Sequence, residues 1–281
     1  MLNRSIKLYL TLALMLIQAQ PSWAILNGAN TDEEVFHHAI AYIDTGMSHC
    51  SGLLVAPNVV LTAAHCIGPT GTEGSTNDVW FDSEQSELRH RVGKFFSDPT
   101  FIEVPASKQK ENDYALGILN EILVPTEATP ISVYLKPLQV NEKVILAGYG
   151  ANNDATFAGL DYANADDKVR IDEWTRLHPG NLYSGLAHAS LFQGSYVGLS
   201  SANEAALAPG DSGSSLLTKI NEVWFSRGIA TRAGPFKDKD GIEKNVSIFV
   251  PVANLRFLEF IKLVQTTHKI KICGIDLVCS N

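Results

Sequence analysis

The chain has 281 residues, 45% hydrophobic and 19% charged, and its 22 basic and 30 acidic side chains give a net charge of −8. This balance excludes an intrinsically disordered chain, and 21 Gly and 12 Pro without a period exclude a collagen-like one. A nucleic-acid partner is not expected, because no basic stretch is present to neutralise phosphates. The length allows one large domain or two small ones.

The first 24 residues have the layout of a secretory signal peptide. Arg4 and Lys7 precede an apolar run at residues 8–17, and Ser22-Trp23-Ala24 provides a small-x-small cleavage site. A transmembrane anchor is the weaker alternative, because a span needs roughly 20 apolar residues. We therefore expect cleavage after Ala24, and secretion into the extracellular space or a periplasm with no membrane contact afterwards.

Four cysteines follow the signal segment: Cys50, Cys66, Cys273 and Cys279. An even number in an exported chain indicates disulfide bonds. Three pairings are possible, and the spacing favours the two local ones, Cys50–Cys66 and Cys273–Cys279. Four free thiols are less consistent with an oxidising compartment. A zinc site is weaker still, because Cys66 follows His65 but no CxxC pair exists, so no metal is expected.

Short runs of aliphatic and aromatic residues recur along the chain, separated by Gly, Pro, Asn and Asp. Many short strands with turn residues between them are typical of all-β barrels and sandwiches. The expected strands are residues 39–43, 52–55, 59–63, 115–119, 144–148, 168–174, 213–217, 223–231 and 247–252. Residues 68–77 and 151–167 are rich in Gly, Thr, Asn or Asp and are expected to be loops.

One helix is expected, over residues 254–266. Leu255, Leu258, Ile261 and Leu263 fall near a 3.6-residue period, and Asn254 is a suitable N-cap. A midpoint between two halves of similar length lies within residues 125–136.

Three segments carry residue types suited to nucleophilic catalysis. His65 lies just after the expected strand 59–63, and Asp113 lies just before the expected strand 115–119. Ser212 lies within Gly210-Asp211-Ser212-Gly213. A serine hydroxyl is a poor nucleophile unless a base lies within hydrogen-bond reach and a third group orients that base. The flanking glycines permit a tight turn whose N–H groups face one point, as an oxyanion site requires.

These motifs, T-A-A-H-C at 62–66, D-x-A-L at 113–116 and G-D-S-G at 210–213, resemble those of the trypsin-like, chymotrypsin-fold serine proteases of family S1. Residues 146–150 also resemble the strand that opens the second barrel of that family. The resemblance covers nearly the whole chain after residue 24. It implies an all-β fold of two antiparallel six-stranded β-barrels with a C-terminal α-helix, divided into signal peptide 1–24, N-terminal barrel 25–135, C-terminal barrel 136–253, and helix and tail 254–281.

The resemblance implies a secreted serine endopeptidase that hydrolyses peptide bonds through an acyl-enzyme, without metal or organic cofactor. His65 would be the general base and acid, Asp113 would orient it, and Ser212 would attack the scissile carbonyl. The N–H groups of Gly210 and Ser212 would bind the oxyanion. Asp82 and Asp98 also lie between His65 and Ser212 in sequence. Asp113 is favoured because only it precedes an apolar strand at the expected distance from the histidine.

The implied partners are protein or peptide substrates and, as a further class, protein inhibitors, and the enzyme is expected to be a monomer. Cleavage after Ala24 would expose Ile25-Leu26-Asn27-Gly28, which resembles the start of activated family members. In the family the new α-ammonium pairs with the acid before the nucleophile, here Asp211. We therefore hypothesise that signal peptidase itself creates the active N-terminus.

The resemblance also locates the primary substrate pocket. Its base falls on Ala206, and its walls fall on Thr231, Arg232, Ala233 and Ser247. A neutral, partly apolar pocket predicts uncharged side chains of small to medium size.

Two departures from the family pattern leave alternatives open. Ala208 stands where a cysteine usually ties this loop, so Glu204 could approach the pocket and favour basic side chains. Arg232, where an aromatic residue is common, could instead attract acidic ones.

Other functions fit less well. An esterase of the α/β-hydrolase type needs G-x-S-x-G in a βαβ pattern with its histidine last, whereas Ser214 occupies the fifth position here and His65 comes first. A G-D-S-type lipase carries its motif near the N-terminus. A catalytically silent, protease-like binding or adhesion module is the main alternative, and the presence of all three triad residues disfavours it.

Overall fold

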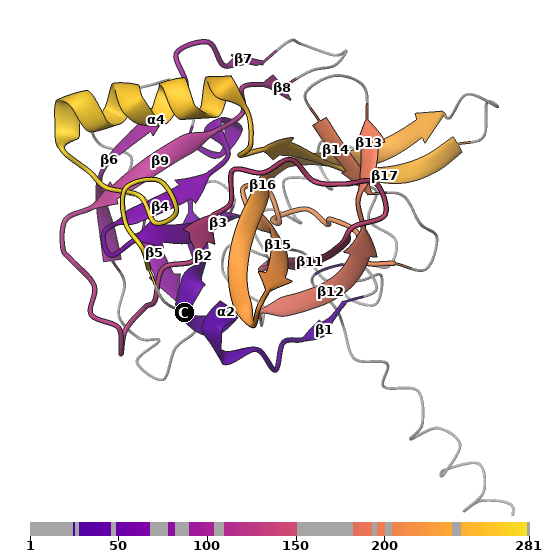
Figure 1. Cartoon of the computed structure of the whole chain (residues 1–281), viewed down its shortest axis with the longest axis horizontal. Coiled ribbons are helices and arrows are strands. Elements are labelled where there is room, and N and C mark those ends of the chain that lie inside the picture. Colours follow the sequence, from indigo (N-terminus) through magenta and orange to yellow (C-terminus); the bar gives the residue numbers. More distant parts are fainter. Residues whose placement is uncertain are drawn as a thin grey trace, which may run out of the picture.

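The computed structural model describes residues 25, 28–45, 49–67, 78–81, 90–103, 110–150, 182–192, 196–199, 204–237 and 243–279. The expected signal peptide, the expected loops 68–77 and 151–167, and the expected strand 168–174 lie outside these residues, as does Asp82. The described chain consists mostly of strands, which confirms the all-β fold class (Figure 1).

The N-terminal half forms a closed six-stranded barrel, as predicted. In order around the barrel, its strands are β2 (Ile40–Asp44), β3 (His49–Ala56), β4 (Val59–Thr62), β9 (Ala115–Leu119), β6 (His90–Ser97) and β5 (Asp78–Phe81). Every residue of β3 is buried. This strand is covered on both faces because one side lines the barrel and the other contacts the C-terminal half, where Ser51 N–H donates to Ser212 O at 2.8 Å.

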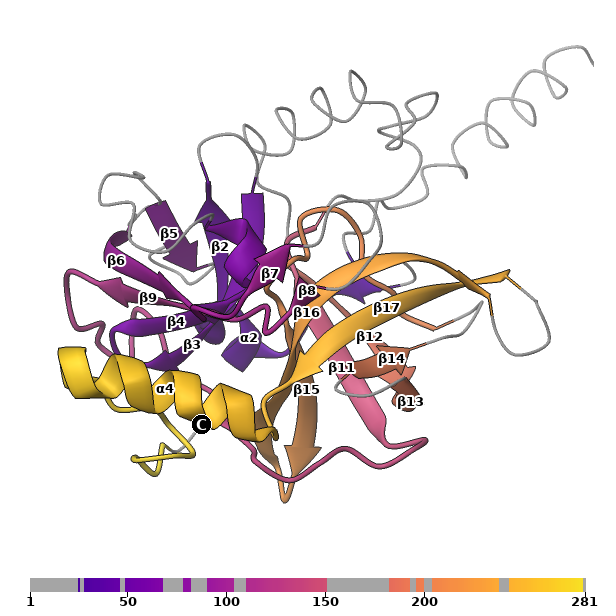
Figure 2. The same ribbon diagram turned by 90° about the horizontal axis from the view of Figure 1, so that it is seen from above.

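The C-terminal half is built on a nine-stranded sheet. Its body consists of β12 (Tyr183–His188), β11 (Lys143–Gly148), β15 (Ser215–Ile220), β16 (Val223–Lys237), β17 (Glu243–Pro251) and β14 (Tyr196–Leu199). The short strands β1 (Ala29–Asn30), β13 (Ser190–Phe192) and β10 (Ser132–Val133) extend these six. A small separate sheet pairs β7 (Ile102–Glu103) with β8 (Lys110–Glu111). Figure 2 shows the two halves side by side.

The C-terminal helix α4 (Leu255–His268) confirms the expected helix. Asn254 caps it, since its side-chain oxygen accepts a 2.7 Å hydrogen bond from Phe257 N–H. The predicted apolar face was right for Ile261, which is buried, but wrong for Leu255 and Leu263, which are 72% and 53% exposed. The buried face instead consists of Phe257, Phe260, Ile261 and Val264, whose spacing fits the helical period more closely.

Helix α4 lies against the N-terminal barrel rather than the half that precedes it in sequence (Figures 1 and 2). Two short helices, α2 (Glu34–Ala39) and the 3₁₀ turn η1 (Ala64–Cys66), were not predicted. No helix within the described ranges is long and apolar enough to cross a membrane.

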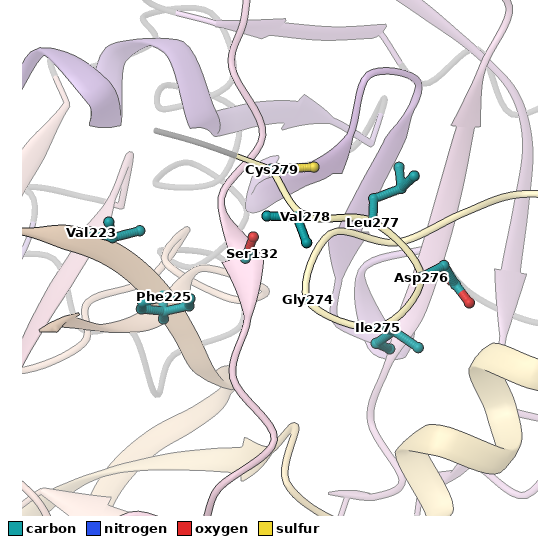
Figure 3. Close-up of a pocket in the computed structure, with 9 residues that line it drawn as sticks. All are labelled: Ser132, Val223, Phe225, Gly274, Ile275, Asp276, Leu277, Val278 and Cys279. Carbon is teal, nitrogen blue, oxygen red and sulfur yellow. The ribbon is translucent and has the colours of Figure 1, made fainter. Parts of the chain in front are cut away.

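The tail after α4 returns to the junction between the two halves. Cys273 N–H donates to Val55 O, and Val133 N–H donates to Cys273 O, both at 2.9 Å. The Cys273–Cys279 disulfide closes this loop, as the spacing predicted. The tail and β16 enclose a mainly apolar cavity of about 570 Å³ (Figure 3), lined by Ser132, Val223, Phe225, Gly274, Ile275, Asp276, Leu277, Val278 and Cys279.

Candidate active site

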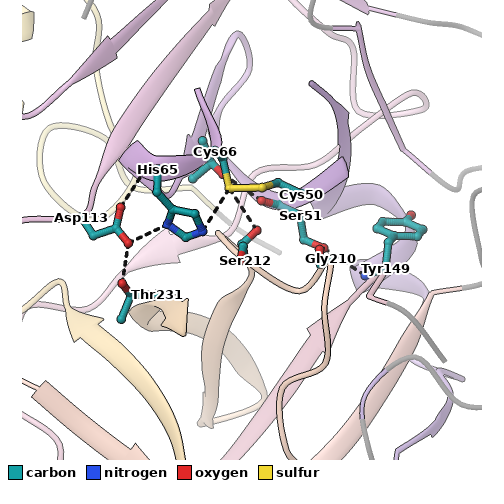
Figure 4. The surroundings of a disulfide bond; sticks show 10 residues. Cys50, Ser51, His65, Cys66, Asp113, Tyr149, Gly210, Ser212 and Thr231 are labelled. Carbon is teal, nitrogen blue, oxygen red and sulfur yellow. Dashed lines mark hydrogen bonds and ion pairs between the residues drawn. A yellow bond between two sulfur atoms is a disulfide. The ribbon is translucent and has the colours of Figure 1, made fainter. Parts of the chain in front are cut away.

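Strand pairing places His65 and Asp113 together at one end of the first barrel. Thr62 of β4 pairs with Ala115 of β9, so the residues just after β4 and just before β9 meet. His65, on η1, donates its ring Nδ1–H to Asp113 Oδ2 at 2.8 Å and its backbone N–H to Oδ1 at 2.9 Å (Figure 4). Two bonds from one residue fix both the position and the orientation of the carboxylate against the ring.

The surroundings of Asp113 keep this carboxylate ionised. Burial alone would raise its pKa, but the charge of His65, the hydrogen bond from its ring and the Thr231 hydroxyl together hold the pKa below its usual value. Thr231 lies on β16 of the other half and donates to Asp113 Oδ2. Thr231, predicted as a pocket wall, therefore also contacts the acid, a role that its sequence position did not reveal.

The alternative acid Asp98 is engaged elsewhere. Its carboxylate accepts two hydrogen bonds from Arg256 of α4, at 2.7 and 2.9 Å, and also bonds the backbone and side chain of Thr100. The hydrogen bonds to Asp98, together with its charge, raise the pKa of Arg256. Asp98 therefore links the last helix to the first barrel and does not contact His65.

The Gly-Asp-Ser-Gly turn, residues 210–213, has a backbone at both glycines that only glycine adopts readily. Gly210 and Gly213 have φ values of +94° and +82°. A Cβ atom on Gly210 would lie 2.1 Å from His49 Nε2, and one on Gly213 would lie 2.1 Å from Thr62 Oγ1. The two glycines are thus required by both backbone conformation and packing.

The carbonyl groups of the first three residues of this turn accept hydrogen bonds, whereas two of its N–H groups are open. Ser51 bonds the carbonyls of Gly210 and Ser212, and Ser214 N–H donates to Asp211 O at 2.9 Å. Within the described ranges, neither Gly210 N–H nor Ser212 N–H donates to another protein group. These are the two groups predicted to bind an oxyanion.

Ser212 lies beside the His65 ring in Figure 4. No hydrogen bond joins its hydroxyl to His65 Nε2 among the described contacts, and in substrate-free structures this bond is often long.

The Cys50–Cys66 disulfide, with Cα atoms 6.2 Å apart, links η1 to β3 next to the His65 ring. His65 Nε2 lies 4.0 Å from Cys66 Sγ. The two sulfurs are bonded to each other, so Cys50, His65 and Cys66 do not form a thiolate metal site.

Asp211 and Ile25 are both completely buried in the C-terminal half. Asp211 accepts hydrogen bonds from Gly150 N–H and Ala208 N–H, each at 2.8 Å. These bonds only partly offset burial, which raises the pKa of Asp211 to about 8. No basic side chain of the described residues forms an ion pair with it. In the full chain the Ile25 nitrogen belongs to a peptide bond, so it carries no charge.

The predicted pocket segments lie next to one another. Ala233 of β16 pairs with Ser247 of β17, and the Ser247 hydroxyl accepts a 2.8 Å hydrogen bond from Leu207 N–H, next to Ala206. Ser247 is buried and Ala233 is exposed. The segment before Ser212 therefore contacts β17, which in turn pairs with β16.

The two charged residues considered for the pocket differ in their surroundings. Glu204 bonds His188 of β12, with 2.8 Å to the ring Nδ1 and 3.0 Å to the backbone N–H. This contact holds Glu204 on the β12 side of the loop. Arg232 is exposed on β16.

A closed barrel joined to a larger antiparallel sheet, with a His–Asp pair beside a Gly-Asp-Ser-Gly turn, defines the chymotrypsin-like class of serine proteases. The family model described as Trypsin matches residues 25–261. The chain therefore belongs to the trypsin family.

Curated relatives and a solved structure agree with this assignment. Kallikrein 1-related peptidase b24 of Mus musculus is 32% identical over 115 residues, which cover 36% of this chain and 43% of the relative. Kallikrein 1-related peptidase b27 of Mus musculus is 28% identical over 163 residues, which cover 53% and 61%. The chain thus spans about half the length of these two relatives. Neuropsin, a serine protease expressed in the limbic system of mouse brain, superposes with a TM-score of 0.60 at 19% identity, over 85% of this chain and 98% of neuropsin, and shares the fold.

Proposed function

We propose that the chain is a secreted serine endopeptidase that cleaves peptide bonds through Ser212, His65 and Asp113. The observation that carries this proposal is the double hydrogen bond from His65 to Asp113 beside the 210–213 turn. Because Nδ1 donates its proton to Asp113, Nε2 is left as the basic nitrogen on the side of Ser212.

The reaction follows from these positions. Nε2 of His65 takes the proton of the Ser212 hydroxyl as its oxygen attacks the scissile carbonyl carbon. The negative charge that develops on the carbonyl oxygen is bound by Gly210 N–H and Ser212 N–H. His65 then donates the proton to the leaving amine, which leaves an acyl-enzyme, and a water activated by the same nitrogen hydrolyses it. Asp113 stays ionised and stabilises the imidazolium.

Removal of residues 1–24 would create a free α-ammonium group on Ile25, which this proposal also requires. The free α-ammonium of Ile25 would compensate the buried Asp211 carboxylate, to which the described residues supply two backbone donors. Signal cleavage itself would then produce the active enzyme, as a monomer outside the cell or in a periplasm. N-terminal sequencing of the exported protein tests this step, and a start other than Ile25 contradicts it.

The neutral pocket proposed around Ala206 favours substrates with uncharged, small to medium side chains before the cleaved bond. The His188–Glu204 contact supports this preference over a basic one, because it engages the carboxylate that was considered as an attraction for basic side chains. A peptide-library cleavage profile tests it. Dominant cleavage after Lys or Arg would contradict the neutral pocket, and dominant cleavage after Asp or Glu would indicate Arg232 instead.

A fluorophosphonate probe distinguishes an enzyme from a protease-like binding module. We expect the probe to label the exported protein, and labelling to vanish in Ser212→Ala. Ser214→Ala, which removes the next hydroxyl along the chain, is the matched control and should retain labelling. An exported protein that starts at Ile25 and takes no label would favour the binding module.

A further inference from the structure

The hydroxyl group of Ser51 is buried directly beneath the Gly-Asp-Ser-Gly turn. Ser51 is 0% exposed and belongs to β3 of the first barrel. Its Oγ donates to Gly210 O at 3.0 Å and accepts from Tyr149 N–H at 3.0 Å. Its backbone N–H donates to Ser212 O at 2.8 Å. One residue therefore holds the carbonyls of both residues whose N–H groups face the predicted oxyanion (Figure 4).

The peptide between Gly210 and Asp211 is held at both of its polar ends, because its N–H donates to Ala208 O at 3.1 Å and its carbonyl accepts from Ser51 Oγ. Among the described residues, Ser51 Oγ is the one donor to Gly210 O. Gly210 has no Cβ and lies at φ +94°, so its own conformational preference does not hold the adjoining peptides. The carbonyls of Asp211 and Ser212 accept bonds from backbone N–H groups instead of from a side chain.

We propose that Ser51 is a positioning residue: by holding the Gly210 carbonyl it fixes the backbone conformation of Gly210, so that the Gly210 N–H, which belongs to the preceding peptide, faces the developing oxyanion. This inference rests on the proposed peptidase function. The hydroxyl acts through Gly210 and does not touch the substrate, so its effect falls on stabilisation of the transition state. A purely structural role would lower thermal stability without changing kcat in the folded protein.

Loss of the Ser51 hydroxyl should therefore lower kcat and leave KM nearly unchanged. In Ser51→Ala, Gly210 O and Tyr149 N–H lose their shared partner in a buried place, and the Gly210–Asp211 peptide keeps only the bond from Asp211 N–H to Ala208 O. We expect kcat to fall about 10- to 100-fold, less than the largest loss seen on removal of an oxyanion donor, with KM within about threefold of the parent value. Binding of a peptide boronic acid, whose tetrahedral adduct occupies the oxyanion site, should weaken by a similar factor.

The matched control is Ser226→Ala. Ser226 is also 0% exposed, and its hydroxyl bonds Ser215 Oγ at 2.6 Å. It should lose stability but keep kcat and boronic acid affinity.

A second pair of variants, Ser51→Thr and Ser51→Val, keeps the test valid if Ser51→Ala does not fold. The two new side chains have nearly equal volumes, and β-branched residues suit a strand. Thr retains the hydroxyl and should exceed Val in kcat by about tenfold or more.

Equal kcat in the Thr and Val variants, or a parent-like kcat and boronic acid affinity in Ser51→Ala, would overturn the positioning role while leaving the peptidase function intact. A parent protein that takes no fluorophosphonate label would instead overturn the proposed function, and this inference with it.

Discussion

The Thr231 hydroxyl donates to the Asp113 carboxylate from the opposite half of the molecule. Asp113 precedes a strand of the first barrel, whereas Thr231 lies on β16 of the second sheet. The acid that contacts His65 is therefore held by groups from both halves, and its ionisation depends on how they pack together.

Asp113→Asn should lower kcat by roughly 10⁴, because the amide no longer holds the Nδ1–H tautomer of His65. Steady-state kinetics on a peptide substrate measure this loss. The matched control is Asp98→Asn, which removes a buried charge from the same barrel. It should lower thermal stability through loss of the Arg256 contact but leave kcat of the folded protein near the parent value. A mild effect at Asp113 with a large one at Asp98 would reverse the assignment.

Thr231→Val preserves volume but removes the hydroxyl that donates to Asp113. We expect kcat to fall about tenfold, since a hydrogen bond to a charged group is lost. Thr218→Val is the control, because Thr218 is a buried threonine of β15 whose hydroxyl bonds Arg227 instead. It should cost stability only. Similar kcat values in the two variants would show that the Asp113 contact is dispensable.

Stability of a form with a blocked Ile25 nitrogen should fall as pH rises from about 4 to 8. Asp211 has a pKa of about 8 in the folded chain against an ordinary value of 3.8. In that window the folded state therefore keeps a proton that the unfolded state has lost, so raising the pH favours unfolding. Melting temperatures of a chain with one extra residue before Ile25, followed across this range, measure the effect.

Two comparisons sharpen this pH prediction. Asp211→Asn in the blocked form should remove the decline, and the chain that starts at Ile25 should show a smaller one, because its α-ammonium stabilises the carboxylate. An unchanged decline in Asp211→Asn would show that another group is responsible.

Replacing Cys273 and Cys279 together with Ser should cost roughly 2 kcal/mol of stability, the loop-closure value for a short loop. The bridge spans only six positions, and the backbone bonds of Cys273 go to Val55 and Val133 rather than to the site. We therefore expect a lower melting temperature with unchanged kcat. A marked loss of kcat would show that the tail influences the site.

Local patterns in the sequence were sufficient to predict most of the individual elements. Alternating and continuous apolar runs predicted strands such as β9, and Asn254 marked the start of α4, because these signals depend on neighbours in the chain. The helix face was partly mispredicted because the leucines fit the period loosely, and the larger aromatic side chains bury more apolar surface when they face the barrel.

The opening residue counts and the three short motifs, read alone, determined the fold class, the trypsin family and the candidate residues His65, Asp113 and Ser212. The tertiary structure decided which groups surround them. Thr231 reaches Asp113 and Ser51 reaches Gly210 only because the two halves pack face to face. Contacts between residues more than a hundred positions apart leave no local pattern, so the ionisation of Asp113 and the orientation of the Gly210 peptide are properties of the packed interface.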